Sequence, residues 1–149
     1  MEKQTELEQQ FIFLKGIELV VIDERTGKKE SFQFENGLEA FIDYLNYEKK
    51  TIHSTVSFQD LSNPIEVEIA FQFIEGYQEN VISFVNLVRT SDGGTHETGF
   101  RSGFTKVFNE YARKYGLLKA KDKNLEGADV REGLTGVISI KIPESLLQF

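Results

Sequence analysis

The sequence predicts an α+β fold in which helices pack on one face of a mixed β-sheet. Apolar and polar residues alternate from Ile65 to Ile74, which is the pattern of a strand with one buried face. Apolar residues recur at helical spacing between Phe100 and Tyr115, which predicts a long amphipathic helix. Strand patterns lie before and after that helix, and 149 residues are enough for one domain with its own core.

The first part of the chain combines a hairpin with a short helix. Residues 2–14 are expected to form a helical turn or two. Alternating residues at 17–21 and 31–34, separated by the turn sequence ERTGKK, predict a β-hairpin. An amphipathic helix is then expected from Gly37 to Asn46, because apolar residues stand at i, i+3, i+4 and i+7. These residues are Leu38, Phe41, Ile42 and Leu45.

Three strands are expected between this helix and the long one. The clearest is Ile65 to Ile74, and Val56 to Leu61 is its expected partner across the turn Ser62–Pro64. Gly76 marks the turn into a third strand, Val81 to Val88.

The long helix follows a pair of glycines. Gly93 and Gly94 permit a tight turn, and Thr95 is the expected N-cap residue. A charged connection with a short helix comes next, and the last strand runs from Leu134 to Ile142 before Pro143. The apolar residues of the long helix are assigned to the core. They are Phe100, Phe104, Val107, Phe108, Tyr111 and Tyr115.

Composition limits the class of protein. The chain has no cysteine and no apolar run near the roughly 20 residues that span a bilayer, so a cytoplasmic protein without disulfides or membrane helices is expected. The net charge of −7 disfavours a protein that coats DNA unaided. Residues 1–88 hold 7 Lys/Arg against 16 Asp/Glu, whereas residues 89–149 hold 10 against 8. The second half is therefore the better candidate to face DNA, although unequal halves are also common among solvated surfaces.

Local motifs do not predict a catalytic or metal site. The glycine pair before the long helix lacks the lysine of a phosphate loop, so a turn is favoured over an anion site. His53 and His96 stand outside any metal-ligand spacing and are expected to be structural. Asp129, Arg131 and Glu132 are expected to form a surface ion-pair cluster rather than an acid-base group.

Basic residues gather along the long helix and at its exit. They do not share one narrow stripe, so any DNA contact is expected to involve phosphates without sequence specificity. The candidates for DNA contact are Arg101, Lys106, Arg113, Lys114 and Lys119. Lys121 and Lys123 follow them in the same connection.

Three long strings of residues carry a family resemblance. They are DGGTHETGF from Asp92, NEYARK from Asn109, and DVREGL from Asp129. Together with the opening strand pair and the ending IPESLLQF, they resemble the transducer domain of the B subunit of bacterial type IIA topoisomerases, gyrase or topoisomerase IV. The resemblance runs from Leu14 to Phe149 and leaves residues 1–13 as an N-terminal extension or helix end.

The resemblance implies a mechanical module rather than a catalytic one. The fold would include a left-handed β-α-β crossover through the long helix. In the resembling proteins the ATP pocket lies in a preceding domain, and a glutamine-threonine-lysine loop follows the residues that match Leu147 to Phe149. No catalytic, cofactor-binding or metal-binding residue is therefore expected in this chain, and the isolated chain is expected to be inactive. ATP and magnesium would serve the full enzyme, which is an isomerase.

The resemblance also implies partners. They are the ATPase domain of the same subunit, the DNA cleavage subunit, a second copy of the ATPase subunit, and DNA that is bound weakly. Two alternatives remain open from the sequence. One is a non-catalytic module that binds protein or DNA, and the other is the second domain of a related clamp ATPase of the mismatch-repair or chaperone type.

Overall fold

The computed structural model describes residues 18–33 and 37–147, and it confirms the α+β class with a mixed sheet. The helical turn expected at residues 2–14 lies outside this part of the chain. Strands β1 (Glu18–Asp23) and β2 (Lys28–Gln33) pair antiparallel as a separate hairpin, with Glu18 opposite Gln33. Helix α2 (Gly37–Leu45) follows in the place that the apolar spacing predicts.

Five strands form the main sheet in the order β3-β4-β7-β5-β6. They are β3 (Val56–Asp60), β4 (Glu66–Phe73), β5 (Asn80–Val85), β6 (Val88–Arg89) and β7 (Leu134–Lys141). Neighbours pair antiparallel except β5 and β7, which are parallel. A parallel pair needs a long crossover, and here the connection contains α3 (Thr95–Lys114) and the short α4 (Gly127–Val130). A short 3-10 turn, Glu144–Leu146, follows β7.

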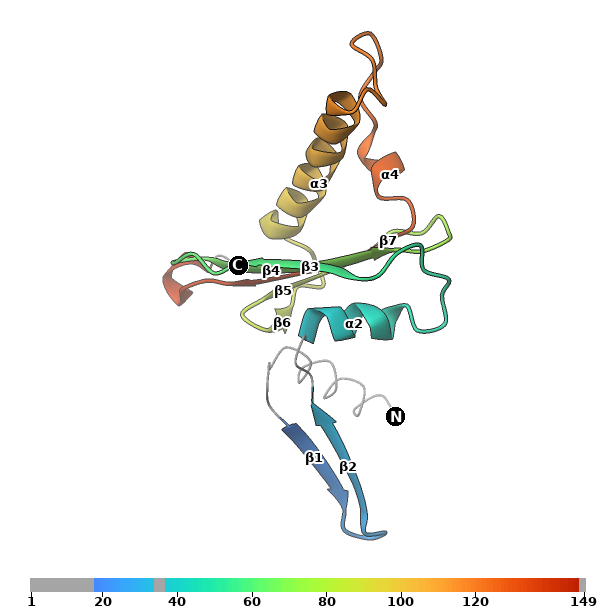
Figure 1. The fold of residues 1–149 in the computed structure, drawn as a ribbon. Helices are drawn as coiled ribbons and strands as arrows, with labels where there is room; N and C mark the ends of the chain where they lie inside the picture. Colours follow the sequence, from blue (N-terminus) through green and yellow to red (C-terminus); the bar gives the residue numbers. More distant parts are fainter. Residues whose placement is uncertain (1–17, 34–36, 148–149) are drawn as a thin grey trace.

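The two main helices lie on opposite faces of the sheet, which corrects the expectation that helices share one face. Figure 1 shows α2 on one side and α3 on the other. Ile69 and Ala70 of β4 explain why, because neighbouring strand residues point to opposite faces. Ala70 packs in the cluster of α2, around Phe41 and Ile42. Ile69 packs in the cluster of α3 with Phe100.

Local geometry corrects two further expectations. The strand predicted from Val81 to Val88 is divided, because Asn86 and Leu87 have φ of 48° and 68° and turn the chain back as a two-residue hairpin. Thr95 is the first residue of α3 rather than its cap. The N-cap is Gly94, which offers no side-chain cap.

The apolar stripe of α3 is buried only near the start of the helix. Phe100 is buried and Phe104 is half-buried, whereas Phe108 is 37% exposed. Val107, Tyr111 and Tyr115 are also exposed, so their assignment to the core is wrong for the described part of the chain. An open apolar groove of about 470 Å³ lies between α3 and β3–β4. Its lining includes Phe58, Val67, Phe71 and Phe104.

Candidate functional site

The start of α3 is bound to strand β5 by polar side chains. Ser83 of β5 is 2% exposed, and its hydroxyl donates to Glu97 Oε2 at 2.8 Å. The same hydroxyl lies 2.6 Å from Thr90 Oγ1, which in turn lies 3.1 Å from His96 Nε2. The first turn of α3 is therefore held to the sheet by side-chain hydrogen bonds, in addition to the short connection through Gly93 and Gly94.

Ion pairs extend this contact to α4. Glu79, just before β5, accepts hydrogen bonds from Arg101 of α3 and from Arg131 after α4. The Nε of Arg131 lies 3.0 Å from Glu79 Oε1, and Arg101 Nη2 lies 3.0 Å from Glu97 Oε1. The result is one continuous network across β5, α3 and α4, which we name the polar chain. Its members are Glu79, Ser83, Thr90, His96, Glu97, Arg101 and Arg131.

Partial burial sets the electrostatics of the polar chain. Burial lowers the pKa of the Arg101 guanidinium, and the positive charge of Arg131 lowers this pKa further. Burial also lowers the pKa of His96, while the Glu97 carboxylate opposes that shift. Glu97 lies in the first turn of α3, where the helix dipole favours a negative charge. The chain therefore joins an imidazole whose pKa is lowered by burial to two carboxylates and two guanidinium groups.

The other end of α3 holds the loop that follows it. Arg113 uses three donors: its Nε and Nη2 donate to Asn124 Oδ1 at 3.1 and 2.6 Å, and its Nη1 donates to the Lys119 carbonyl at 3.0 Å. Its Nη2 also donates to the Asp122 carbonyl at 2.9 Å. A planar guanidinium suits such a set of acceptors because its donors have fixed directions. Arg113 thus connects Lys119, Asp122 and Asn124 of this loop to the end of α3.

The five residues proposed for DNA contact occupy different surroundings. Arg101 belongs to the polar chain, and its side chain is 33% exposed. Arg113 and Lys119 are brought together by the loop. Lys106 lies 3.8 Å from Glu110, and Lys114 lies 5.6 Å from the ring centre of Tyr115. Lys106 and Arg113 line one open groove of about 410 Å³ beside α3, and Arg101 is not part of its lining.

The histidines and the cluster at 129–132 have structural surroundings. His53 Nε2 accepts from the Phe73 backbone N–H at 2.9 Å, and its Nδ1 donates to the Ser54 carbonyl at 2.6 Å. Both ring nitrogens are thereby occupied. Arg131 pairs with the distant Glu79 rather than with Asp129 or Glu132, so the expected local cluster is wrong. Within residues 18–33 and 37–147, no group of three His, Cys, Asp or Glu side chains is placed to hold a metal ion.

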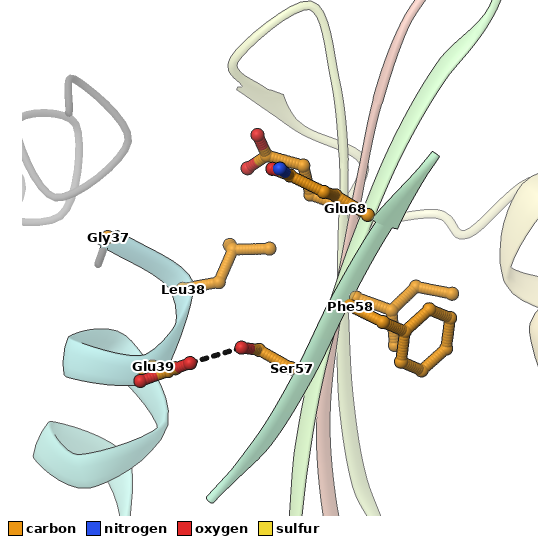
Figure 2. A pocket seen from close by; sticks show the side chains of 8 residues that line it. Gly37, Leu38, Glu39, Ser57, Phe58 and Glu68 are labelled. Carbon is orange, nitrogen blue, oxygen red and sulfur yellow. Dashed lines mark hydrogen bonds between the residues drawn. The ribbon is translucent and has the colours of Figure 1, made fainter. Parts of the chain in front are cut away.

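Two depressions of the surface are lined by carboxylates. The one beside Gly93 has about 240 Å³, and its lining combines the carboxylates of Asp92 and Glu97 with one basic residue, Arg89. The other lies between α2 and β3 and has about 220 Å³. Figure 2 shows Glu39 of α2 accepting a hydrogen bond from Ser57 in this depression, with Glu68 nearby and the Phe58 ring on the far side of β3. Neither lining offers a lysine, and the second offers no basic residue.

The fold and the site define an α+β domain with a single parallel crossover, whose long helix is fixed to the sheet at one end and carries a basic loop at the other. The family model described as DNA gyrase B matches residues 37–149. The chain therefore belongs to the DNA gyrase B family, as its resemblance to bacterial type IIA topoisomerases indicates.

Known proteins resemble this chain over nearly its whole length. The B subunit of DNA topoisomerase 4 from Bacillus subtilis is 57% identical over 143 residues, which is 96% of this chain and 22% of that protein. The protein of the same name from Enterococcus faecalis is 54% identical over 145 residues, which is 96% of this chain and 21% of that protein. The chain thus spans about a fifth of the length of these curated relatives.

A solved structure shares the fold. The 43K ATPase domain of Thermus thermophilus gyrase B, solved in complex with an aminocoumarin, matches with a TM-score of 0.88 and 32% identity. The match covers 99% of this chain and 40% of that one. No helix among the described residues is long and apolar enough to cross a membrane.

Proposed function

We propose that this chain is the transducer domain of the B subunit of a bacterial type II topoisomerase. In that role it couples ATP binding and hydrolysis to closure of a DNA clamp, to strand passage and to the change of DNA topology. The domain comprises residues 14–149, and residues 1–13 are an N-terminal extension or the end of a helix. The enzyme is a cytoplasmic isomerase that uses ATP and magnesium, both of which act outside this chain.

The polar chain is the observation that supports this role. A domain that passes force between two others needs elements that move as one body. Ser83 and Glu97 tie α3 to β5, and Glu79 ties both to Arg131 after α4. A displacement of α3 is therefore transmitted to the sheet instead of being absorbed in a loose connection.

The proposal includes the partners of such a domain. They are the ATPase domain of the same subunit, the DNA cleavage subunit, and a second copy of the ATPase subunit. DNA is a further partner, which the domain contacts weakly through the phosphates. For that contact we retain Arg101, Lys106, Arg113, Lys114 and Lys119 as candidates, with Arg101 the least accessible because it is paired with two carboxylates.

The test separates coupling from catalysis in the full-length subunit that contains this segment, assembled with its cleavage partner. Arg131→Met removes the hydrogen bonds that the Arg131 guanidinium donates to Glu79, to the Arg101 carbonyl and to the Thr105 hydroxyl, and it keeps the length of the side chain. We expect ATP analogue binding to be retained, while ATP-dependent strand passage falls roughly tenfold or more, about 1.4 kcal/mol of coupling. Asp129→Asn, at an exposed position on α4, is the matched control and should behave as the parent.

The same experiment has a clear opposing result. Strand passage unchanged in Arg131→Met, at a thermal midpoint low enough to show that the hydrogen bonds are broken, would contradict the proposed coupling. A second check uses the chain alone. Calorimetric titration with a non-hydrolysable ATP analogue and magnesium should give no binding heat, and a saturable micromolar site would place the nucleotide in this chain after all.

A further inference from the structure

Strand β5 turns out of the sheet before its neighbour β7 has ended. The parallel pairing of the two strands stops at Val85, which lies opposite Ile140. The backbone then turns at Asn86 and Leu87, whose φ angles are 48° and 68°, and returns as β6. The backbone of β5 has therefore turned away at the point where Ile142, just after β7, would need its next partners in the ladder.

The side chain of Asn86 supplies those partners. Its backbone N–H donates to the Ile140 carbonyl at 2.8 Å, as in a parallel ladder. In such a ladder the carbonyl of Asn86 would accept from the Ile142 N–H, and the N–H of residue 88 would donate to the Ile142 carbonyl. Val88 pairs back with Val85 instead. The Asn86 amide replaces both groups, because Oδ1 accepts from the Ile142 N–H at 2.9 Å and Nδ2 donates to the Ile142 carbonyl at 3.0 Å.

Asparagine suits both requirements of this position. It adopts a positive φ more readily than most residues that have a side chain. Its amide also carries one acceptor and two donors, so it can bond both backbone groups of one residue at once. Aspartate would lose the donor, and glutamine would carry the amide on a longer side chain. Leu87 shares the positive φ but has no polar side chain, which makes it a control within the same turn.

The hairpin of β5 and β6 also holds part of the polar chain. Thr90, the residue after β6, donates its N–H to the Ser83 carbonyl at 2.9 Å, and the two hydroxyl oxygens lie 2.6 Å apart. The Ser83 hydroxyl donates to Glu97 in the first turn of α3. The hairpin therefore contacts the start of α3 through the polar chain and contacts Ile142 through Asn86. Hydrogen bonds form a continuous route from α3 to the residue after β7.

We propose that Asn86 is a positioning residue for the coupling of ATP hydrolysis to strand passage. Its amide keeps Ile142 aligned with the sheet, so a movement of α3 changes the direction of residues 142–147, which we name the exit of β7. Pro143 follows Ile142 with a fixed φ of −58°, which limits how far the exit can bend by itself. The inference rests on the proposed function and adds a residue outside the polar chain.

The first experiment measures amide hydrogen exchange in the chain itself. Asn86→Gly keeps the positive φ and removes the amide, whereas Leu87→Gly makes the same backbone change and keeps the amide. The exchange rate at Ile142 is divided by the rate at Val137, in the middle of β7, to correct for any change in global stability. We expect this ratio to rise roughly fivefold in Asn86→Gly, as for the loss of one hydrogen bond, and to stay at the parent value in Leu87→Gly.

Three results of this experiment would overturn the proposal. The first is a ratio that is unchanged in Asn86→Gly. The second is an equal rise in Asn86→Gly and Leu87→Gly, which would assign the effect to the turn and not to the amide. The third is an Ile142 amide that exchanges in the parent as fast as in an unstructured peptide.

The second experiment measures coupling in the full-length subunit that contains this segment, assembled with its cleavage partner. The measured quantity is the number of strand-passage events per ATP hydrolysed. Loss of folded protein lowers both rates equally and leaves this quantity unchanged, whereas loss of coupling lowers it. We expect Asn86→Gly to lower it roughly fivefold or more and Leu87→Gly to keep the parent value. An unchanged value in Asn86→Gly, or the same decrease in both variants, would contradict the positioning role.

A double variant tests the route through the hairpin. Ser83→Ala removes the hydroxyl that joins Thr90 and Glu97. If Ser83 and Asn86 act on one route, Ser83→Ala with Asn86→Gly should lower the events per ATP no further than the more harmful single change. Reductions that multiply in the double variant would show two independent routes and would overturn the route from α3 through the hairpin.

This inference and the proposed function fail separately. A parent value of events per ATP in Asn86→Gly, beside reduced strand passage in Arg131→Met, would remove the role of Asn86 and keep the coupling through the polar chain. Strand passage that ignores both changes would contradict the proposed function itself. In that case faster exchange at Ile142 in Asn86→Gly would still show that the amide holds the exit of β7.

Discussion

Asn109 and Leu125 are joined by a reciprocal pair of hydrogen bonds. The Asn109 Nδ2 donates to the Leu125 carbonyl at 3.1 Å, and the Leu125 N–H donates to Asn109 Oδ1 at 2.7 Å. Asn109 is only 7% exposed, so its amide replaces a backbone partner for a segment that returns along α3. Together with Arg113 one turn later, it fixes the end of the loop to the helix.

Replacing Asn109 by alanine should therefore lower the free energy of unfolding by about 2 kcal/mol. Two hydrogen bonds contribute about 1 kcal/mol each, and the Leu125 groups lose their partner. The urea midpoint measures the change. Ser102→Ala, at an exposed position of the same helix, is the control and should stay within about 0.5 kcal/mol of the parent. Equal stability of the two variants would contradict the role of the amide.

The phenylalanines of α3 should differ in their contribution to stability. Phe100 is buried at 8% exposure among Ile69, Leu134 and Ile138, so Phe100→Ala should cost about 3 to 5 kcal/mol. Phe108 is 37% exposed, and Phe108→Ala should cost about 1 to 2 kcal/mol in this chain. The midpoints of guanidinium-induced unfolding of the two variants measure which substitution costs more stability. A larger loss of stability at Phe108 would mean that its ring is covered in solution.

His96 should make stability depend on pH. Burial lowers its pKa in the folded chain below the ordinary value of 6.5, so the unfolded chain takes up the proton first as the pH falls. The stabilising contribution is full above about pH 6.5 and is lost as the pH drops toward the lowered folded value. His96→Gln lacks this titration. Unfolding free energies are measured at pH 7.5, 6.5 and 5.5. As the pH falls, the stability of the parent should decrease more than that of the variant. A difference that stays constant with pH would exclude the effect.

Gly133 and Gly27 form a natural pair for a substitution test. Both have positive φ, 74° and 69°, where a side chain is strained by about 1 to 2 kcal/mol. At Gly133 an added Cβ would also lie 2.6 Å from the Ile74 carbonyl oxygen, whereas at Gly27 nothing lies within 4 Å. We expect Gly27→Ala to cost about 1 to 2 kcal/mol and Gly133→Ala more than about 4 kcal/mol or to prevent folding. Similar thermal midpoints for Gly27→Ala and Gly133→Ala would show that the backbone near Gly133 can shift to make room for the added methyl group.

Local patterns were sufficient where the deciding interactions are local. The spacing of Leu38, Phe41 and Ile42 predicts α2 because one buried stripe is what an amphipathic helix needs. The division of the strand at Asn86 and Leu87 was missed, since leucine rarely adopts a positive φ and only the asparagine hints at a turn. The side-chain amide of Asn86 bonds the Ile142 backbone, 56 residues away, which fixes that turn through tertiary contact.

Long-range partners limited the prediction of the site. Periodicity identifies the apolar stripe of α3, but it does not show what covers the stripe, and Val107 and Tyr111 are exposed here. It also cannot assign a helix to one face of the sheet, so α2 and α3 were wrongly placed together. The polar chain depends on Glu79 meeting Arg131 across 52 residues, and the local cluster around Arg131 does not indicate that partner. The basic residues near Lys119 could be identified because charge is visible in the sequence. The hydrogen bonds that Arg113 donates to this loop could not be predicted from the sequence.

The position of β7 has a consequence for how the domain opens. This strand is hydrogen-bonded to β4 along one edge and to β5 along the other, and the clusters of α2 and α3 cover its two faces through Val137 and Ile138. Fraying of a sheet edge or release of a single helix therefore does not expose the backbone amides of β7 to solvent. Hydrogen exchange at β7 should therefore be the slowest in the chain and should report complete unfolding, while the β6 turn exchanges in local openings.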